Sequence, residues 1–425
     1  MSRTRVANAA VLAALFLLPW QTRWLFHDLA LAGQAWEYGR LSVYGNELLI
    51  LVAALLRGRP HVPYQLLSLS KGLMLFLGAL LISGSWSMNV ALTLGYLQHV
   101  VAAVALFMLV VDERTVLRDA ATAFVAGLLV PCGLAWWQVT AGTSPSSSWL
   151  GLAAHDASAL GASVVETGTD RILRGYGTLP HPNLFGGYLA VGLFLCAWLI
   201  RGLSTNRSRL LAAAPVAVLA STLVLTFSRS SWLAVAAGFV ALAMFALFQK
   251  RSVPHRALPF LALALVAVVA TLAVFHVPAF TRFQPAARLE AKSIAERSGE
   301  YPLWDDVARE NVVTGVGPGN YTVALSVLYP GQNVYAYQPI HNAFLLFLAE
   351  TGLVGLFAAV RIVRDASRAF RPWRPTFAIT FALSFFILLL VLAGLDHYLW
   401  SLWPGLVLGA VAVGFSLKIR ETASS

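Results

Sequence analysis

Long apolar stretches recur along the whole chain, and they constrain its fold more than any other sequence feature. An apolar run of about 17 to 25 residues can span a bilayer as a helix. These runs predict about twelve transmembrane helices, near residues 6–20, 41–56, 71–88, 90–111, 120–140, 184–200, 210–227, 230–248, 257–276, 341–360, 376–394 and 399–417. The sequence therefore predicts an all-α polytopic membrane protein, with residues 1–425 forming a single transmembrane domain.

Charged residues are scarce and unevenly placed. They make up 12% of the chain, against roughly 25% in an average soluble domain. If the N-terminus is cytoplasmic, 20 of the 30 Lys and Arg residues fall in cytoplasmic breaks, as the positive-inside rule requires. Both termini are therefore expected in the cytoplasm. This topology explains the formal charge of +11 better than nucleic-acid binding does, because the basic residues form no continuous patch.

The first apolar run and the two cysteines suggest no processing and no cross-link. Arg3 and Arg5 precede the first run as in a signal peptide, but no small-residue cleavage site follows, which favours an uncleaved helix. Cys132 and Cys196 lie inside predicted helices without paired spacing or histidine neighbours. We expect neither a disulfide nor a zinc site from them.

Two outer segments are too long to be simple turns. Residues 141–183 begin with a flexible Gly, Ser and Pro stretch and then become mildly apolar. Residues 277–340, between the ninth and tenth predicted helices, show helical spacing over 288–311 and then a glycine-rich stretch at 315–320. The second segment is rich in Trp, Tyr and apolar residues, which argues against disorder. It predicts an outer loop with one or two interfacial helices, and we expect this segment to carry the chemistry of the protein.

Arg229 stands in a short polar break, Phe227-Ser-Arg-Ser-Ser-Trp232, between two predicted helices at the outer membrane face. One interpretation is a turn residue that extends its charge to the headgroup region. The other is a guanidinium held for a phosphate, which its fixed charge and bidentate geometry suit. The local sequence leaves both open.

His341 and Asn342 open the tenth predicted helix, whose end carries Gly352 and Gly355. A helix N-terminus attracts anions, and a histidine there could act as a general base or bind a phosphate. The alternative is an interfacial helix cap followed by glycines that allow close packing.

Other polar residues gather on the same predicted face. Arg174 and His181 precede the sixth predicted helix, although turn chemistry alone could explain their Gly-rich and Pro-rich surroundings. The 315–319 glycines match neither the dinucleotide fingerprint nor the P-loop. Asp305 and Asp306 are adjacent, so their side chains diverge on a helix and no metal site is expected. The residues expected on this face are Arg174, His181, Arg229, Arg288, Arg297 and His341, which suits an anionic headgroup carried on a lipid.

In combination these motifs resemble those of the O-antigen ligase and polymerase superfamily of bacterial envelope proteins, in particular the O-antigen ligases. His341-Asn342, nine further residues and Gly352-x-x-Gly355 match the ligases' His-[Asn/Ser/Gln]-x9-Gly-x-x-Gly signature. Arg229-Ser-Ser-Trp-Leu233 matches their Arg-x3-Leu element, and residues 177–183 and 304–320 resemble the flanking segments. Relatives tend to have an arginine a few residues before the tryptophan, where this chain has Glu300.

The resemblance implies a GT-C-like glycosyltransferase that works on the periplasmic face of the bacterial inner membrane. It would transfer O-antigen polysaccharide from undecaprenyl pyrophosphate to lipid A core oligosaccharide in lipopolysaccharide biosynthesis. Its partners would be this donor, this acceptor and membrane lipids, with no nucleic acid. Because the pyrophosphate is already a good leaving group, we expect no cofactor and no metal, and direct attack would invert the anomeric centre.

The same resemblance assigns roles to the candidate residues. His341 would be the base or an acceptor-orienting group, and Arg229 with Arg288 or Arg297 would bind the pyrophosphate. The residues expected to bind substrate are Arg174, His181, Asn342 and Trp304.

Three rival functions remain at this stage. An O-antigen polymerase and a protein O-oligosaccharyltransferase share the donor but use a growing glycan or a protein hydroxyl as acceptor. A transporter or flippase for lipid-linked sugar would also need a basic cavity facing lipid headgroups. Transporters usually have repeated halves with helices broken at the midplane, and the sequence shows neither.

Overall fold

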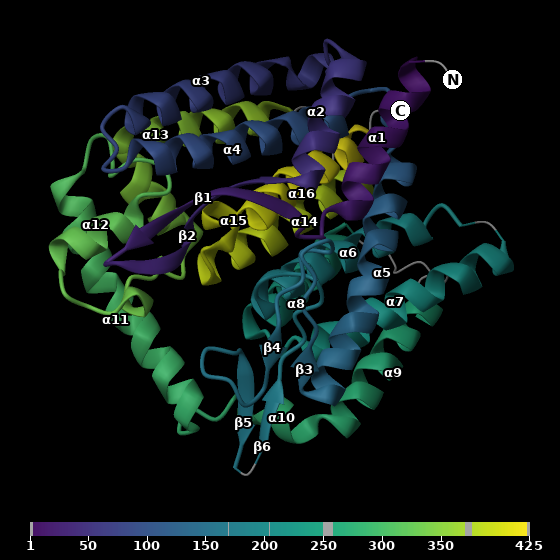
Figure 1. Cartoon of the computed structure of the whole chain (residues 1–425). Helices are drawn as coiled ribbons and strands as arrows, with labels where there is room; N and C mark the ends of the chain where they lie inside the picture. Colours follow the sequence, from purple (N-terminus) through teal and green to yellow (C-terminus); the bar gives the residue numbers. More distant parts are fainter. Residues whose placement is uncertain (1–2, 169, 204, 250–257, 370–375, 423–425) are drawn as a thin grey trace.

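Helices dominate the computed structural model, which describes residues 3–168, 170–203, 205–249, 258–369 and 376–422 (Figure 1). Helices at the predicted spans are α1 (Arg3–Leu17), α2 (Gly45–Arg57), α3 (Leu67–Gly84), α4 (Val90–Val111), α5 (Leu117–Ala141), α6 (Pro182–Ile200), α7 (Asn206–Leu225), α8 (Arg229–Phe248), α9 (Leu258–Val274), α13 (Ala343–Ala369), α14 (Phe377–Leu395) and α16 (Trp403–Glu421). The others are α10 (His276–Thr281), α11 (Arg288–Glu310), α12 (Tyr321–Leu328), α15 (Tyr398–Ser401) and the 3-10 turns η1 (Tyr64–Leu66) and η3 (Val334–Ala336).

The prediction of an all-α polytopic membrane protein is confirmed. Within the described ranges, eight helices are long and apolar enough to cross a bilayer: α3, α4, α5, α6, α8, α13, α14 and α16. The apolar parts of α7 and α9 are shorter, and so are α1 and α2. Only 17% of the apolar window of α8 is buried, as expected for a helix facing lipid. Five basic residues assigned to the cytoplasm, Lys250, Arg251, Arg256, Arg371 and Arg374, lie outside the described residues.

Short antiparallel hairpins are the main departure from the predicted helices. They pair β1 (Arg23–Leu31) with β2 (Gln34–Tyr44), β3 (Thr143–Ser144) with β4 (His155–Asp156), and β5 (Val164–Thr167) with β6 (Asp170–Leu173). The first hairpin takes residues 41–44 from the second predicted helix. Helix α2 begins only where the Glu47 carboxylate accepts a hydrogen bond from the Tyr44 backbone at 2.7 Å, which caps its first turn. Glu47, a charged residue within the predicted apolar run at 41–56, therefore marks the start of the helix in the structure.

Both termini lie at one end of the bundle (Figure 1). Arg3 donates to the carbonyl of Leu56 at 2.9 Å, near the C-terminal end of α2. Lys418, near the end of α16, donates to the carbonyl of Val110 at 3.2 Å, near the end of α4. About 15 residues of helix, roughly 22 Å, separate Lys418 from the start of α16. The loop before α16 is therefore at the opposite end of the bundle.

The segment between α9 and α13 folds back onto a break in α13. Gly352 interrupts this helix with a φ of +57°, a conformation that suits glycine, and frees backbone groups on either side. Val316 donates to the carbonyl of Ala349 at 3.0 Å, and Leu353 donates to the carbonyl of Val312 at 2.9 Å. The glycine-rich stretch at 315–319 is thus anchored to α13 through main-chain hydrogen bonds.

Candidate functional site

His341 lies at the N-terminal end of α13 and is held by a carboxylate from α11. Its backbone N–H donates to Glu300 Oε2 at 2.8 Å, and its Nδ1 lies 2.7 Å from Glu300 Oε1. Asn342 caps the helix, since its side-chain oxygen accepts from the backbone N–H groups of Phe344 and Leu345 at 3.0 and 3.1 Å. The His-Asn pair thus separates two tasks: the asparagine starts the helix, and the histidine faces Glu300.

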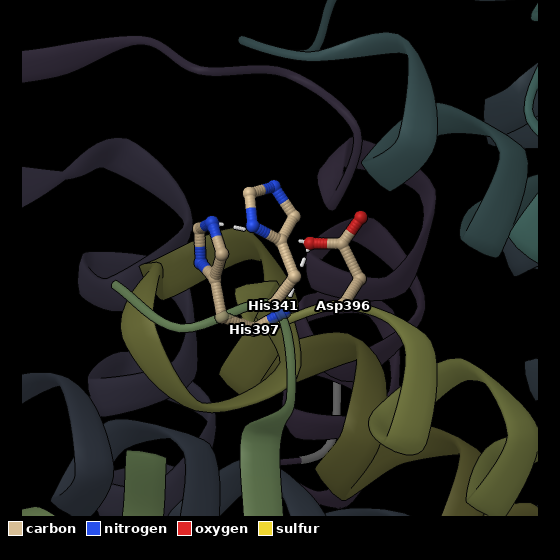
Figure 2. A group of neighbouring side chains, drawn as sticks. All are labelled: His341, Asp396 and His397. Atoms are coloured by element: carbon tan, nitrogen blue, oxygen red, sulfur yellow. Dashed lines mark hydrogen bonds and ion pairs between the residues drawn. The ribbon is translucent and has the colours of Figure 1, made fainter. Parts of the chain in front are cut away.

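A second polar pair from the loop after α14 meets His341. The ring of His397 packs edge-on against that of His341, with centroids 5.2 Å apart. Asp396 lies beside both (Figure 2), and its backbone carbonyl accepts from Ala343 at 3.1 Å, which ties the end of α14 to the start of α13. The cluster therefore combines two helix ends that are distant in sequence.

Arg174 and His181 approach the same cluster from the loop before α6. Asn183 joins them, because its side chain donates to Asp396 at 2.8 Å and accepts from Arg174 at 2.6 Å. Arg174 is buried and also donates to the carbonyl of Thr226 at 2.8 Å. His181 caps α6, with Nδ1 accepting from the Asn183 backbone at 3.1 Å. The fold thus brings Arg174 and His181 close to His341.

The three histidines differ in basicity. Burial lowers the pKa of His181 to about 3 and that of His397 to about 4, so both are neutral at neutral pH. Burial also acts to lower the pKa of His341, but the hydrogen bond to Glu300 and the nearby Asp396 and Glu300 charges raise it overall. Among these three, His341 alone keeps the proton affinity that a general base needs.

Arg229 begins α8 next to a tight turn, in which Phe227 has a φ of +47°. Its guanidinium lies 3.1 Å from Glu290 of α11 and donates to the carbonyl of Arg282 at 2.9 Å. Arg282 pairs with the same Glu290 carboxylate and donates to the carbonyl of Phe227 at 3.0 Å. Arg229 therefore belongs to a network beside α11 rather than to the contacts of His341 itself.

The two candidate arginines of α11 have different surroundings. Arg288 is exposed and pairs with Glu166 of β5 at 2.5 Å, outside the histidine cluster. Arg297 lies three residues before Glu300, so both side chains share one face of the helix. Within the described part of the chain, the Arg297 guanidinium has no hydrogen-bond or ion-pair partner, and its Nε is buried. Its positive charge acts to lower the pKa of both His341 and His397.

Trp304 fixes α11 against α13. Its indole N–H donates to the carbonyl of Leu345 at 2.7 Å, one helical turn after Glu300. Trp304 and Glu300, four residues apart, therefore hold the same face of α11 on the start of α13. This contact orients the surface from which Arg297 projects.

A metal ion could fit the cluster by distance alone. One ligand atom from each of His341, Asp396 and His397 lies within 4.8 Å of the others. Glu300 and Asn183 already hydrogen-bond to His341 and Asp396, and Arg297 and Arg174 add positive charge nearby. These partners disfavour a bound cation at this cluster. The expected absence of a metal stays a prediction.

Sequence reasoning missed Asp396, His397 and the partnership of Glu300 with His341. The first two form a polar pair in the short break between the last two apolar runs, on the face where His341 was expected. That position was the available signal. Glu300 was noticed only as a departure from relatives, although it is the residue that contacts the histidine.

Comparison with known proteins gives one match. Residues 214–360 match the family model Wzy_C, described as O-antigen ligase. The matched segment contains Arg229, α11 and His341, whereas the β1–β2 hairpin and the Asp396–His397 pair lie outside it. No curated protein matches the chain.

Proposed function

We propose, on the premise that this chain is a member of the O-antigen ligase superfamily through residues 214–360, that it is an O-antigen ligase. Its donor would be O-antigen polysaccharide on undecaprenyl pyrophosphate, and its acceptor the lipid A core oligosaccharide. Members of this family are glycosyltransferase-like enzymes of the ligase and polymerase group. The ligase role follows from the His341-Asn342 and Gly352-x-x-Gly355 signature.

One observation carries the proposal. His341 is hydrogen-bonded to Glu300, and Arg297, one turn earlier in α11, is half-buried with a buried Nε and no partner for its guanidinium among the described residues. A base and an uncompensated cation side by side match the two charges of glycosyl transfer from a pyrophosphate. A purely structural ion pair would leave no guanidinium without a partner.

The reaction assigns one atom to each task. A neutral imidazole that donates from Nδ1 to Glu300 keeps its lone pair on Nε2. That nitrogen takes the proton of the acceptor hydroxyl while the hydroxyl oxygen attacks the anomeric carbon. The bond from this carbon to the pyrophosphate oxygen breaks, and undecaprenyl pyrophosphate leaves with the electron pair. Direct attack inverts the anomeric centre.

The pyrophosphate needs positive charge that does not move during the reaction. Arg297 supplies the nearest guanidinium, and Arg229 with Arg282 extends the basic surface along α11, where both are held by Glu290. Arg174 and His181 lie beside the cluster at the start of α6. Asn342 caps α13, and Trp304 holds α11 against it. With this charge in place, we propose a transfer that needs no metal.

We assign the site to the periplasmic face of the bacterial inner membrane, with residues 277–340 and 141–183 on that side. The clustering of both termini at the end of the bundle away from His397 supports this topology, with both termini cytoplasmic.

Reconstitution with purified protein tests the proposal. The protein is placed in vesicles with only the lipid-linked donor and lipid A core, and the glycolipid products are separated by mass. A ligase yields O-antigen joined to lipid A core. Longer glycan still attached to undecaprenol would identify a polymerase, and movement of the donor between leaflets without transfer would identify a transporter.

A further inference from the structure

The β1–β2 hairpin encloses a polar hollow beside the histidine cluster. A cavity of about 440 Å³, within the ~300–1,000 Å³ usual for ligand sites, is lined by Arg23, Glu37, Arg40 and Tyr44 of the hairpin. A second, narrower cavity of about 70 Å³ shares these four residues and runs on to Tyr38. The hairpin lies outside the family match, so the resemblance assigns this hollow no role.

The charges in the hollow compensate one another. Glu37 lies 3.1 Å from Arg23 and 3.0 Å from Arg40, and Asp28 lies 3.7 Å from Arg40, so two carboxylates face two guanidinium groups. The wall therefore offers hydrogen-bond donors and acceptors together without a free positive charge. Sugar hydroxyls, which both donate and accept, are complementary to such a wall. A phosphate would instead select an uncompensated cation such as Arg297.

Two buried hydroxyl groups and an aromatic wall also suit a sugar ligand. The side chains of Ser42 and Thr322 line the narrower cavity, each is 3% exposed, and neither hydroxyl has a hydrogen-bond partner within the described structure. Buried polar groups normally find partners, so these are available to a ligand. Tyr44 packs against Trp403 at 5.8 Å between ring centroids, which adds an apolar surface suited to the C–H face of a sugar ring.

Two edge-on aromatic contacts connect the wall of the narrower cavity to His341. Tyr38 packs edge-on against His397 at 6.2 Å between centroids, and His397 packs against His341 at 5.2 Å. The hairpin thus meets the cluster on the His397 ring, while α11 meets His341 through Glu300. An inverting attack needs the nucleophile on the side away from the leaving group, and the hairpin and α11 contact different residues of the cluster.

We propose that the hollow beneath the β1–β2 hairpin is the subsite for the sugar residues of the acceptor, with Arg23, Glu37 and Arg40 binding their hydroxyls. This inference rests on the proposed transferase function and adds where the acceptor glycan binds.

A matched pair of substitutions tests the subsite. Ala153 and its neighbour Ala154 are both exposed, but only Ala153 lines the larger cavity. Ala153→Trp fills the hollow and should raise the KM for the acceptor by roughly tenfold or more, equivalent to about 1.4 kcal/mol. The KM for the donor should stay unchanged, and Ala154→Trp should behave as wild type. Equal acceptor KM values in the two variants, or a change confined to donor KM, would overturn the subsite.

A binding measurement separates this inference from the proposed function. Core oligosaccharide freed of its lipid is titrated into the full chain in detergent, without donor, by calorimetry. The wild type and Ala154→Trp should bind it, and Ala153→Trp should bind at least tenfold more weakly. If binding follows this pattern but the wild type transfers no glycan, the subsite stands and the ligase function fails. If the oligosaccharide does not bind the wild type, or binds all three proteins equally, the subsite is wrong.

Discussion

The two sides of His341 differ in how their charges are balanced. On the α11 side, half-buried Arg297 has no partner within the described part of the chain and lies near Glu300, whose carboxylate is hydrogen-bonded to His341. On the hairpin side, Glu37 and Asp28 together compensate Arg23 and Arg40. An uncompensated guanidinium favours a phosphate, whereas a compensated one offers hydrogen bonds without net charge. The α11 side therefore suits the pyrophosphate of the donor, and the hairpin side suits the sugar of the acceptor.

The largest expected effect comes from the residue between the two sides. His341→Ala removes the base, so transfer should fall by roughly 10²- to 10⁴-fold while both substrates still bind. His276→Ala, a substitution at the exposed start of α10, is the matched control and should keep near-normal transfer. Initial rates with saturating donor and acceptor measure the effect. Near-normal rates in His341→Ala would contradict the role of His341 as the base between the donor side and the acceptor side.

Next in size is the loss of the unpartnered cation on the α11 side. Arg297→Ala should lower kcat by roughly 10²- to 10³-fold, because the leaving pyrophosphate loses its nearest positive charge. Arg288→Ala, on the same helix, removes only an exposed ion pair with Glu166 and should change the rate by less than about threefold. Kinetics of the two variants side by side decide between the arginines. The reverse order of effects would assign the pyrophosphate to Arg288.

A smaller, pH-dependent effect is expected at Glu300. The base acts as neutral imidazole, so transfer rises with pH as His341 loses its proton. The hydrogen bond from Glu300 and the charges of Asp396 and Glu300 raise the pKa of His341 against the effect of burial, and Glu300→Gln removes the carboxylate that makes this hydrogen bond. The acidic limb of the kcat/KM profile should therefore move to lower pH, with a rate loss of roughly tenfold from poorer positioning. A limb that stays in place would reduce Glu300 to a structural contact.

The smallest expected effect is that of metal removal. Because fixed guanidinium groups meet the charge of the leaving group, EDTA treatment should leave the transfer rate unchanged. Rates before and after chelation, with Mg²⁺ or Zn²⁺ added back, provide the measurement. If chelation abolished activity and one cation restored it, the transfer would depend on a metal ion, with His341, Asp396 and His397 as the candidate ligands.

Most of the helical framework could be predicted because apolar length is a local property. Each predicted helix corresponds to a helix in the structure, with ends displaced by a few residues, except that α13 continues to Ala369 where the prediction ended at residue 360. The β1–β2 hairpin was missed because its length and composition fit a loop between two short helices. Its turn at Ala32 and Gly33, both with positive φ, is the local feature that reverses the chain.

The site could be predicted only in part, because its pairings join distant residues. Topology alone places Arg174, His181 and His341 at one end of the bundle, and the structure brings them together through Asn183 and Asp396. The choice between Arg288 and Arg297 depends on which face of α11 meets α13. That face is set by the contacts of Trp304 and Glu300, which span about 40 residues of sequence and leave no periodic signal.

The most direct test is a structure of the protein with undecaprenyl pyrophosphate bound. The account predicts a phosphate oxygen within hydrogen-bond distance, about 3 Å, of the Arg297 guanidinium, with the Nε2 of His341 facing the position of the anomeric carbon. A pyrophosphate beside Arg288 and Glu166, or one in the hollow beneath the β1–β2 hairpin, would contradict it.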